Sequence, residues 1–278
     1  MPLHKLLNHA LNIRALKPVC LTLGIENNCN LNCEFCFVRH RDRNGMSMNL
    51  IKATLEQFPT IKSIELGLGE PTLHSHFAEI VDLIHSKGIK LGMGTNGTNL
   101  KLFPEDLWRK FSWLSIGITR FIDNRYAETP DFEWLPCRHS FILVLHANTP
   151  PTTWQEKLAQ FQQVNKEPVL IRLDMNARSG TIGRFKRECP EAVQYRERFV
   201  KFNGFCYMGS LKPMIYPDGN VYPCCLGKSG DYYRKYRLGS IFTKFTTTPI
   251  QVECDRCSHT LENETIHKFL NDPDPQFM

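Results

Sequence analysis

Three cysteines are the residues of this chain whose types and spacing most clearly allow chemistry. Cys29, Cys33 and Cys36 form a C-x3-C-x2-C run that directly follows an apolar stretch. Three thiolates at this spacing can hold three irons of a [4Fe–4S] cluster and leave the fourth iron open to a small molecule. A structural zinc site is the alternative, and it would need a fourth ligand such as Cys20 or His40.

Two short motifs further along the chain follow β-rich runs. Gly69, Glu70 and Pro71 come after the first run, and Gly94-Thr-Asn96-Gly97 comes after the second. Glycine lets a backbone approach a ligand closely, and a carboxylate complements an ammonium group. Each motif alone would be interpreted as a turn. In this order after the cysteines, they indicate a ligand site.

The cysteine run, with Phe35 directly before the third cysteine, resembles the radical S-adenosylmethionine (SAM) enzymes. In that family the open iron chelates SAM, and reductive cleavage yields a 5′-deoxyadenosyl radical that abstracts hydrogen from a substrate. Gly69-Glu70-Pro71 is similar to the family's Gly-Gly-Glu-Pro, whose backbone and Glu hold the methionine amino group. Here Leu68 replaces the first glycine, or Gly67 is displaced by one. Asn96 matches a Thr-Asn-Gly that often ends the third strand of these enzymes.

Composition indicates a globular protein that binds metal. The chain has 278 residues, of which 42% are hydrophobic, and it contains no apolar run near the ~18 residues that span a membrane. Residues 1–16 show helical spacing of leucines but no secretory cleavage site. Eleven cysteines at ligand-like spacings favour metal binding in a reducing compartment over disulfides. We therefore expect a cytoplasmic protein without a membrane partner.

The charge of the chain does not indicate a nucleic-acid partner. The net charge of +6 is modest, and nothing resembles a nucleic-acid-binding module. A basic run at Arg39–Arg43 lies just after the cysteines. A phosphate or carboxylate could dock there, although a solvated loop is the simpler interpretation of such a run.

Strand and helix patterns alternate through the first two thirds of the chain. Strands are predicted at 19–25, 63–68, 89–94, 113–118, 140–146 and 168–174. Helices are predicted at 48–58, 76–87, 104–110, 123–128 and 152–165. This alternation predicts an α/β fold with a parallel sheet and right-handed crossovers. A Rossmann-like sheet would fit the same periodicity, but the resemblance implies a partial (β/α)6 barrel.

Sites in parallel β/α folds gather at the carboxyl ends of the strands. This rule brings the three cysteines close to five later side chains: Glu70, Asn96, Thr119, His146 and Asp174. By resemblance, Ser115 contacts SAM, while an Asp that relatives carry after it is missing, which leaves Thr119 and Arg120 without an assigned role. Arg172, Asp174 and Asn176 share one face of the sixth strand. They contact substrate or SAM if that face lines the barrel, and helices or solvent otherwise.

The last quarter of the chain carries a second group of cysteines, namely Cys206, Cys224, Cys225, Cys254 and Cys257. Their spacing around a Pro-Asp-Gly-Asn hairpin turn resembles the auxiliary-cluster domains named SPASM and twitch. The resemblance implies one auxiliary [4Fe–4S] cluster held by Cys206, Cys224, Cys254 and Cys257. Cys225 competes with Cys224, because neighbouring strand residues point to opposite faces. A four-cysteine zinc ribbon is the alternative.

The predicted organisation has three parts: an N-terminal helix at 1–18, the barrel at 19–180, and a linker with a small α+β auxiliary iron–sulfur domain at 181–278. The remaining cysteines, Cys20, Cys137 and Cys189, are interpreted as buried small hydrophobes. His40, His139 and His146 are interpreted as structural, because the sequence shows no partner for them.

The resemblance implies an enzyme with two [4Fe–4S] clusters and SAM, reduced by an external one-electron donor such as flavodoxin or ferredoxin. We expect dehydrogenation of a small polar molecule, such as an amino sugar, cyclitol or nucleotide, with the auxiliary cluster as electron acceptor. The layout is similar to that of short dehydrogenases from aminocyclitol antibiotic pathways. The alternatives are a maturase of a ribosomal peptide, an epimerase of a sugar-like substrate, and a pure electron carrier.

Overall fold

The computed structural model describes most of the chain, in nine ranges: 18–36, 44–123, 129–146, 148–149, 153–174, 179–188, 200–225, 234–257 and 259–271. Several residues named above lie outside these ranges. They are the N-terminal segment before residue 18, the basic run Arg39–Arg43 with His40, Asn176 and Cys189.

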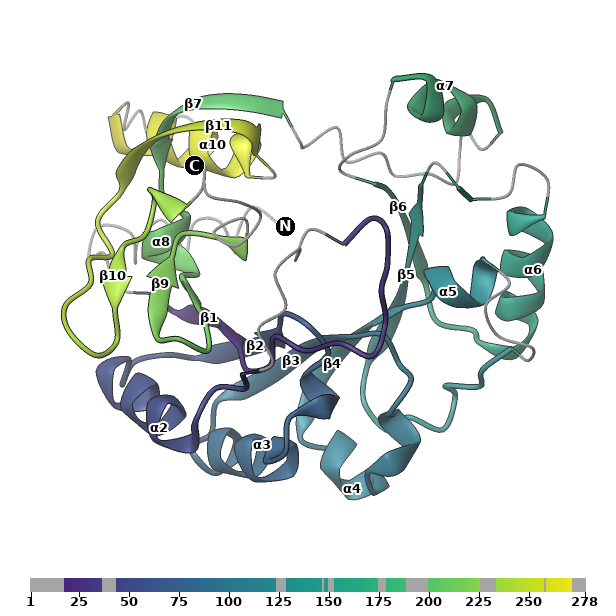
Figure 1. The fold of residues 1–278 in the computed structure, drawn as a ribbon, viewed down its shortest axis with the longest axis horizontal. Helices are drawn as coiled ribbons and strands as arrows, with labels where there is room; N and C mark the ends of the chain where they lie inside the picture. The colour runs from purple at the N-terminus through teal and green to yellow at the C-terminus, as the bar shows by residue number, and fades with distance from the viewer. Residues whose placement is uncertain are drawn as a thin grey trace. The chain divides into compact units, whose positions relative to one another are not determined.

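Strands and helices alternate as the sequence predicts (Figure 1). The first six strands are β1 (Cys20–Gly24), β2 (Ser63–Gly67), β3 (Lys90–Thr95), β4 (Phe111–Gly117), β5 (His139–Leu145) and β6 (Val169–Leu173). The helices among and after them are α2 (Met48–Gln57), α3 (Phe77–Ser86), α4 (Glu105–Trp108), α5 (Thr119–Ile122), α6 (Trp154–Val164) and α7 (Ser179–Glu188). Short 3-10 helices occupy Pro71–Leu73 and Leu100–Leu102.

The last part of the chain adds shorter elements. Its strands are β7 (Val200–Cys206), β8 (Met214–Ile215), β9 (Asn220–Tyr222), β10 (Gly239–Ser240) and β11 (Ile250–Cys257). Its helices are α8 (Met208–Leu211) and α10 (Thr260–Asn271).

The chain divides into two compact units. The first unit comprises residues 1–28, 37–69 and 197–278, and the second comprises residues 29–36 and 70–196. Strand order in the first unit is β10-β9-β8-β1-β2, with β7 and β11 in a separate antiparallel pair. Strand order in the second unit is β3-β4-β5-β6. The loop with the three cysteines therefore belongs to the unit of β3–β6.

Parallel pairing relates the main strands. In the first unit β1 pairs in parallel with both β2 and β8, while β8, β9 and β10 form an antiparallel meander. In the second unit β3 pairs with β4, β4 with β5 and β5 with β6, all in parallel. A parallel sheet with intervening helices is the predicted α/β fold class, which is confirmed.

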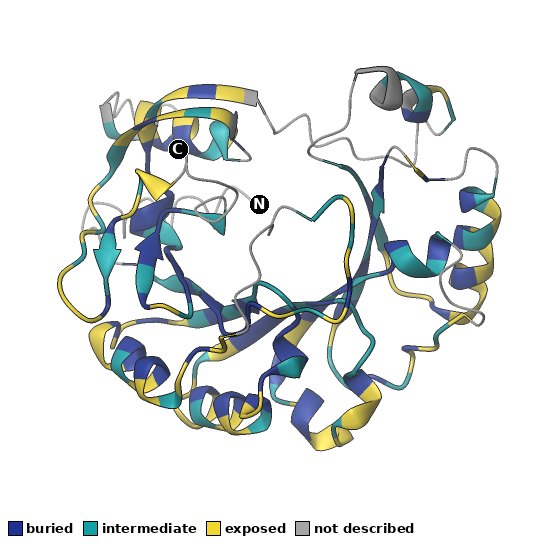
Figure 2. Cartoon of the chain, in the orientation of Figure 1, coloured by how far each residue is buried: buried dark blue, intermediate teal, exposed yellow. Residues whose placement is uncertain are grey.

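The helices form because their apolar residues recur on one face. The Ser47 side chain caps α2 by accepting a hydrogen bond from the backbone N–H of Leu50 at 3.2 Å. In α3 the buried residues Phe77, Ile80, Val81 and Ile84 follow the i, i+3, i+4, i+7 spacing of an amphipathic helix. Figure 2 shows the result, since both helices are buried on one side and exposed on the other.

Alternation along the strands separates a covered face from a face that can line a site. In β5 the odd-numbered residues from His139 to Leu145 are buried, and the residues between them are half-buried. Register then places Arg172 beside Val144, on the half-buried face. The same face carries Ser115, which pairs with Gly94 of β3. A Cβ added at Gly94 would meet no atom within 4 Å, so this face is open above Gly94.

The helix expected at 123–128 falls on residues of which 124–128 lie outside the described ranges. The short helix α5, which the sequence did not predict, precedes it and ends at Ile122. Among the described residues, no helix is long and apolar enough to cross a membrane.

Candidate functional site

The loop Cys29–Cys36 connects to the end of β3 through polar side chains. The Asn96 amide donates to the Sγ of Cys29 at 3.7 Å and to the Oδ1 of Asn30 at 2.8 Å. The amide of Asn30 donates to the Oγ1 of Thr98 at 2.8 Å. The backbone N–H of Leu31 also points at the Sγ of Cys29, at 3.4 Å. N–H groups directed at a sulfur stabilise a thiolate, which is the form of cysteine that binds metal.

Glu70 is the centre of a hydrogen-bond network beside this loop. Its Oε1 accepts hydrogen bonds from the backbone N–H of Thr72 at 3.2 Å, the hydroxyl of Thr72 at 2.6 Å and the hydroxyl of Thr95 at 2.8 Å. Its Oε2 accepts from the backbone N–H of Asn96 at 2.7 Å. Glu70 is fully buried, and this burial raises the pKa of its carboxyl group against the lowering effect of these donors.

Glu70 therefore joins two of the predicted motifs. Pro71 begins the 3-10 helix that follows Glu70, and Glu70 caps that helix. Through Asn96, the carboxylate connects in two steps to Cys29. In the second unit the structure thus brings Glu70, Asn96 and the cysteine loop together. The contact of Glu70 with a methionine ammonium group remains a prediction.

The turn before Glu70 has an unusual backbone. Leu68 and Gly69 have φ values of 62° and 30°, in the left-handed region that glycine tolerates and other residues rarely adopt. A Cβ at Gly69 would lie 2.6 Å from the carbonyl oxygen of Glu26 and closer still to that of Asn28. Leu68 packs against Met214, Tyr216 and Tyr222 of the first unit. This packing offsets the cost of a leucine where the family motif has glycine.

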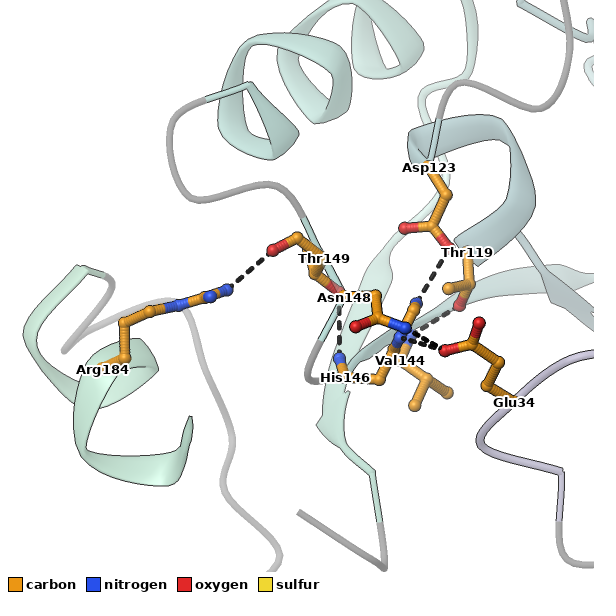
Figure 3. Close-up of polar contacts among 8 residues, drawn as sticks. All are labelled: Glu34, Thr119, Asp123, Val144, His146, Asn148, Thr149 and Arg184. Carbon is orange, nitrogen blue, oxygen red and sulfur yellow. Dashed lines mark hydrogen bonds and ion pairs between the residues drawn. The ribbon is translucent and has the colours of Figure 1, made fainter. Parts of the chain in front are cut away.

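Figure 3 shows a second polar group, at the end of β5. The Nε2 of His146 lies 2.9 Å from the Oδ2 of Asp123, the residue that follows α5. The Asn148 side chain donates to the Oε2 of Glu34 in the cysteine loop. The hydroxyl of Thr119 accepts from the backbone N–H of Val144 at 2.8 Å, which ties α5 to β5. Thr119 therefore has a role in the fold.

The auxiliary cysteines gather in the first unit. Cys206, Cys254 and Cys257 belong to one cluster with Phe202, Met208 and Val252, formed by β7 and β11. Burial, together with the charges of the neighbouring Cys257 and Cys206 thiolates, raises the pKa of Cys254 to about 12. Such mutual repulsion would be relieved by a cationic cluster bound between the sulfurs. Three of the four predicted ligands are therefore side by side.

Cys225 lies in a different environment. It packs against the cluster of Met214, Tyr216 and Tyr222. Burial, with a smaller contribution from the charge of Glu65, raises its pKa to about 11 against the opposing charge of Lys212. Lys212 and Glu65 form an ion pair. Because Cys225 packs in a different group of buried side chains from Cys206, Cys254 and Cys257, we keep Cys224 as the proposed fourth ligand, which stays a prediction.

The residues present fit iron–sulfur clusters by their donor chemistry. Burial raises the pKa of Cys206 to about 11, against the lowering effect of hydrogen bonds from the Met208 backbone and from the side chain of the fully buried Asn263. Among the described residues, no group of three His, Cys, Asp or Glu side chains could hold a metal ion. That finding concerns a single ion, whereas a [4Fe–4S] cluster places each thiolate on a different iron.

Sequence reasoning missed several residues of the site. Two of them, Thr72 and Thr95, donate hydrogen bonds to Glu70. Thr72 directly follows the Gly69-Glu70-Pro71 motif and Thr95 lies within Gly94-Thr-Asn96-Gly97, so the sequence could have indicated both. Asp123 and Glu34 gave no signal, because their contacts with His146 and Asn148 join residues far apart in the chain.

Comparisons with known proteins show which sequences and folds this chain resembles. A model described as the Radical SAM superfamily matches residues 25–126. The 7-carboxy-7-deazaguanine synthase of Bacteroides thetaiotaomicron is 32% identical over 133 residues, which are 45% of this chain and 71% of that enzyme. The S-adenosylmethionine-dependent nucleotide dehydratase of Selenomonas ruminantium is 34% identical over 104 residues, which are 35% of this chain and 38% of the dehydratase.

A solved structure shares the fold. SuiB of Streptococcus suis, bound to its precursor peptide SuiA, superposes with a TM-score of 0.55 at 15% identity, over 81% of this chain and 64% of SuiB. This likeness supports the partial barrel that the resemblance implied. The chain spans 29% and 38% of the length of two curated relatives that it matches. By its matching segment and its similarity to the synthase, the chain belongs to the radical SAM superfamily.

Proposed function

We propose that this enzyme is an oxidoreductase that dehydrogenates a small polar substrate. The observation that carries the proposal is the connected path from buried Glu70 through Asn96 to Cys29. Superfamily membership implies SAM and a [4Fe–4S] cluster, with an external one-electron donor such as flavodoxin or ferredoxin. Bound together, SAM and the cluster would supply a 5′-deoxyadenosyl radical that takes a hydrogen atom from the substrate.

The chain's own residues would bind, orient and shield. Cys29, Cys33 and Cys36 would hold the cluster, while the Asn96 amide supports the charge on the Cys29 sulfur. Gly69, Glu70 and Pro71 would form the methionine site, with Phe35 beside it. Asn96 hydrogen-bonds to Glu70 and to Cys29, so it would contact both the SAM and the cluster.

The open face of β3–β6 is the proposed place for the rest of SAM and for the substrate. Ser115 and Arg172 both lie on this face, by strand register. A hydroxyl and a guanidinium group can bind hydroxyl, carboxylate or phosphate groups. The space above Gly94 gives such a ligand room. These contacts suit a polar molecule such as an amino sugar, a cyclitol or a nucleotide.

A dehydrogenation removes two electrons, and the second one needs an acceptor. We propose an auxiliary [4Fe–4S] cluster at Cys206, Cys224, Cys254 and Cys257 in that role. The support is that three of these cysteines, Cys206, Cys254 and Cys257, pack together in one group of buried side chains on β7 and β11. The eleven cysteines of the chain support a reducing location, so we propose that the enzyme works in the cytoplasm.

The experiment that tests the reaction type measures products in heavy water. The reduced enzyme is incubated with SAM and candidate aminocyclitols, amino sugars and nucleotides, and products are identified by mass. A dehydrogenase releases one 5′-deoxyadenosine per product and lowers substrate mass by two hydrogens, because one hydrogen atom, one proton and one electron leave. A product of unchanged oxidation level with one deuterium would indicate an epimerase and contradict the proposal.

A peptide maturase is the second candidate, because one surface feature favours it. A groove of about 500 Å³ runs along β11, lined by Asn203, Lys235, Tyr236, Arg237 and residues 250–253. A groove beside a strand suits an extended peptide, which can add to a sheet edge. SuiB, which shares the fold, binds the peptide SuiA. Crosslinked or epimerised peptide from a neighbouring open reading frame would favour this candidate over the dehydrogenase.

A further inference from the structure

The end of β5 carries a histidine–carboxylate pair that the proposed function leaves without a role. His146 directly follows β5 and is only 3% exposed. Its Nε2 lies 2.9 Å from Asp123 Oδ2. A carboxylate at this distance fixes both the tautomer and the orientation of an imidazole. The His146 ring is therefore a rigid feature of the strand end.

The ring meets the cysteine loop between its second and third cysteines. The centroid of Phe35 lies 5.4 Å from that of His146, with the ring planes inclined at 41°. The Oε2 of Glu34 lies 4.0 Å from the Nδ1 of His146. Asn148, two residues after His146, donates to the same Glu34 carboxylate (Figure 3). Both residues between Cys33 and Cys36 are thus held from the end of β5.

The β5 end is itself well supported. The backbone N–H of His146 donates to the Oγ1 of Thr149 at 2.9 Å, and the N–H of Thr149 donates back to the carbonyl of His146 at 3.0 Å. Arg184 of α7 donates to the carbonyl of Thr149 at 2.9 Å (Figure 3). Groups held by several elements can position a flexible loop.

The other half of the loop has a separate anchor. Cys29 and Asn30 are bound by Asn96 and Thr98, which follow β3. Within the loop, the backbone N–H of Cys36 donates to the carbonyl of Cys33 at 3.1 Å. Contacts assign residues 29–36 to the unit of β3–β6, although the residues on both sides of the loop belong to the first unit. The ends of β3 and β5 thus supply the two attachment points.

We propose that His146, oriented by Asp123, is a positioning residue for the cluster, and that it holds the Cys33–Cys36 half of the loop together with Asn148. This inference rests on the proposed cluster at Cys29, Cys33 and Cys36. Through Phe35 and Glu34 the β5 end fixes where two of the three thiolates lie. The Asn96 anchor alone leaves that half of the loop to open.

The test compares His146→Gln and Asn148→Ala with the control His139→Leu. The Gln amide can still donate to Asp123 but has no ring for Phe35, and Asn148 is exposed, so neither change leaves the Asp123 carboxylate without a donor. His139 is also a buried histidine of β5, and it contacts Phe141 and the Cys137 carbonyl, away from the loop. The melting temperatures of all variants are measured first and compared with that of the wild type, to establish that each variant is folded.

Two measurements on the anaerobically purified holoenzyme follow the cluster. We expect iron loss to a chelator to be roughly tenfold faster in both test variants, and SAM affinity to be roughly tenfold weaker, as for one lost charged or aromatic contact. The control should stay within about twofold of wild type, the additivity scatter for distant sites. A third measurement, amide hydrogen exchange of residues 33–36 with and without the cluster, should be faster in the test variants only.

Unchanged exchange of residues 33–36 in both test variants would overturn the proposal. Faster exchange without any change in iron loss or SAM affinity would also overturn it, because the loop contact would then have no effect on the cluster. Wild-type protein that binds no iron at these cysteines would refute the proposed function instead. In that case the exchange of the metal-free loop still decides whether the β5 end holds it.

Discussion

Glu70 shows how one buried carboxylate can organise a ligand site. The sequence predicts it as a direct contact to the methionine ammonium group. The structure adds that its two oxygens accept four hydrogen bonds from Thr72, Thr95 and Asn96. A buried charge is tolerated only when such donors surround it. Glu70 therefore also fixes Asn96, the residue that reaches Cys29.

Changing Glu70 to Gln should weaken SAM binding while both clusters remain. Gln carries no negative charge, so the charged hydrogen bond that Glu70 is predicted to accept from the methionine ammonium group is lost, and such bonds contribute about 1.5–3 kcal/mol. We expect roughly ten- to a hundredfold weaker affinity for SAM by calorimetry. Glu79→Gln, at an exposed position of α3, is the matched control. Equal affinity in both variants would place the methionine site elsewhere.

The raised pKa of Glu70 also predicts a dependence of stability on pH. Burial raises this pKa above its usual 4.5, so between the two values the folded chain binds the proton more tightly than the unfolded chain does. That stabilisation is fully present below pH 4.5 and is lost as pH rises through the raised pKa. Urea titrations of the metal-free chains give the free energy of unfolding of the wild type and of Glu70→Gln. The difference, wild type minus variant, should fall as the pH rises from 4.5 through the raised pKa. A flat difference would contradict the burial argument.

Residue patterns predicted the site only where its members stand in short motifs. Cys29, Glu70 and Asn96 could be named because each belongs to such a motif. The pairing of His146 with Asp123 could not, because it joins the residue after α5 to the residue after β5, and only the fold brings these two positions together. The interpretation of His146 as structural was made without this information, because the sequence does not show its partner Asp123.

At the scale of elements, the turn after β2 is the most demanding feature. Gly69 needs both a positive φ and close approach to the carbonyl groups of Glu26 and Asn28. Gly88 at the end of α3 also has a positive φ, of 69°, but a Cβ there would meet nothing within 4 Å. Comparing alanine substitutions at the two glycines therefore separates the cost of a positive φ from the cost of a clash with backbone atoms.

Gly88→Ala should lower the free energy of unfolding by about 1 kcal/mol, the cost of a left-handed alanine. Gly69→Ala should lower it by several times that amount, roughly 3 kcal/mol or more, because backbone atoms must also move. Denaturant unfolding of the two variants measures this difference. Similar losses of unfolding free energy in both variants would show that the turn at Gly69 tolerates a side chain, and would contradict the close backbone contacts described there.

Strand periodicity predicted the elements well because each strand is short, apolar and bounded by turn residues. All six predicted strands overlap β1–β6. The short helix α5 was not predicted, because its four residues are too few to show a helical periodicity in the sequence. The pairing of Thr22 with Met214 and of Leu23 with Ile215 could not be predicted, since β8 is two residues long and distant in sequence.

At the scale of the molecule, the chain order does not follow the compact units. The predicted boundary near residue 180 separates a barrel from an auxiliary domain. Contacts instead group β1, α2 and β2 with residues 197–278. Leu68 and the strand pair β1–β8 provide much of that packing.

A fragment of residues 1–196 should therefore not fold as an independent barrel. Removing residues 197–278 exposes one edge of β1 and the apolar face of Leu68, and exposed strand edges promote aggregation. We expect the fragment to be insoluble, or to unfold without cooperativity in circular dichroism. A soluble fragment that binds four irons and cleaves SAM would show that the predicted domain boundary is the physical one.

The most direct test of the account is the iron content and SAM cleavage of the variant with Cys29, Cys33 and Cys36 changed to alanine. Two cubanes correspond to about eight irons and eight labile sulfides per chain. After anaerobic reconstitution, the variant should retain about four of each, the auxiliary share, and release no 5′-deoxyadenosine from SAM under dithionite. A variant that still cleaves SAM, or a wild-type protein that holds tightly bound zinc in place of iron, would contradict the account.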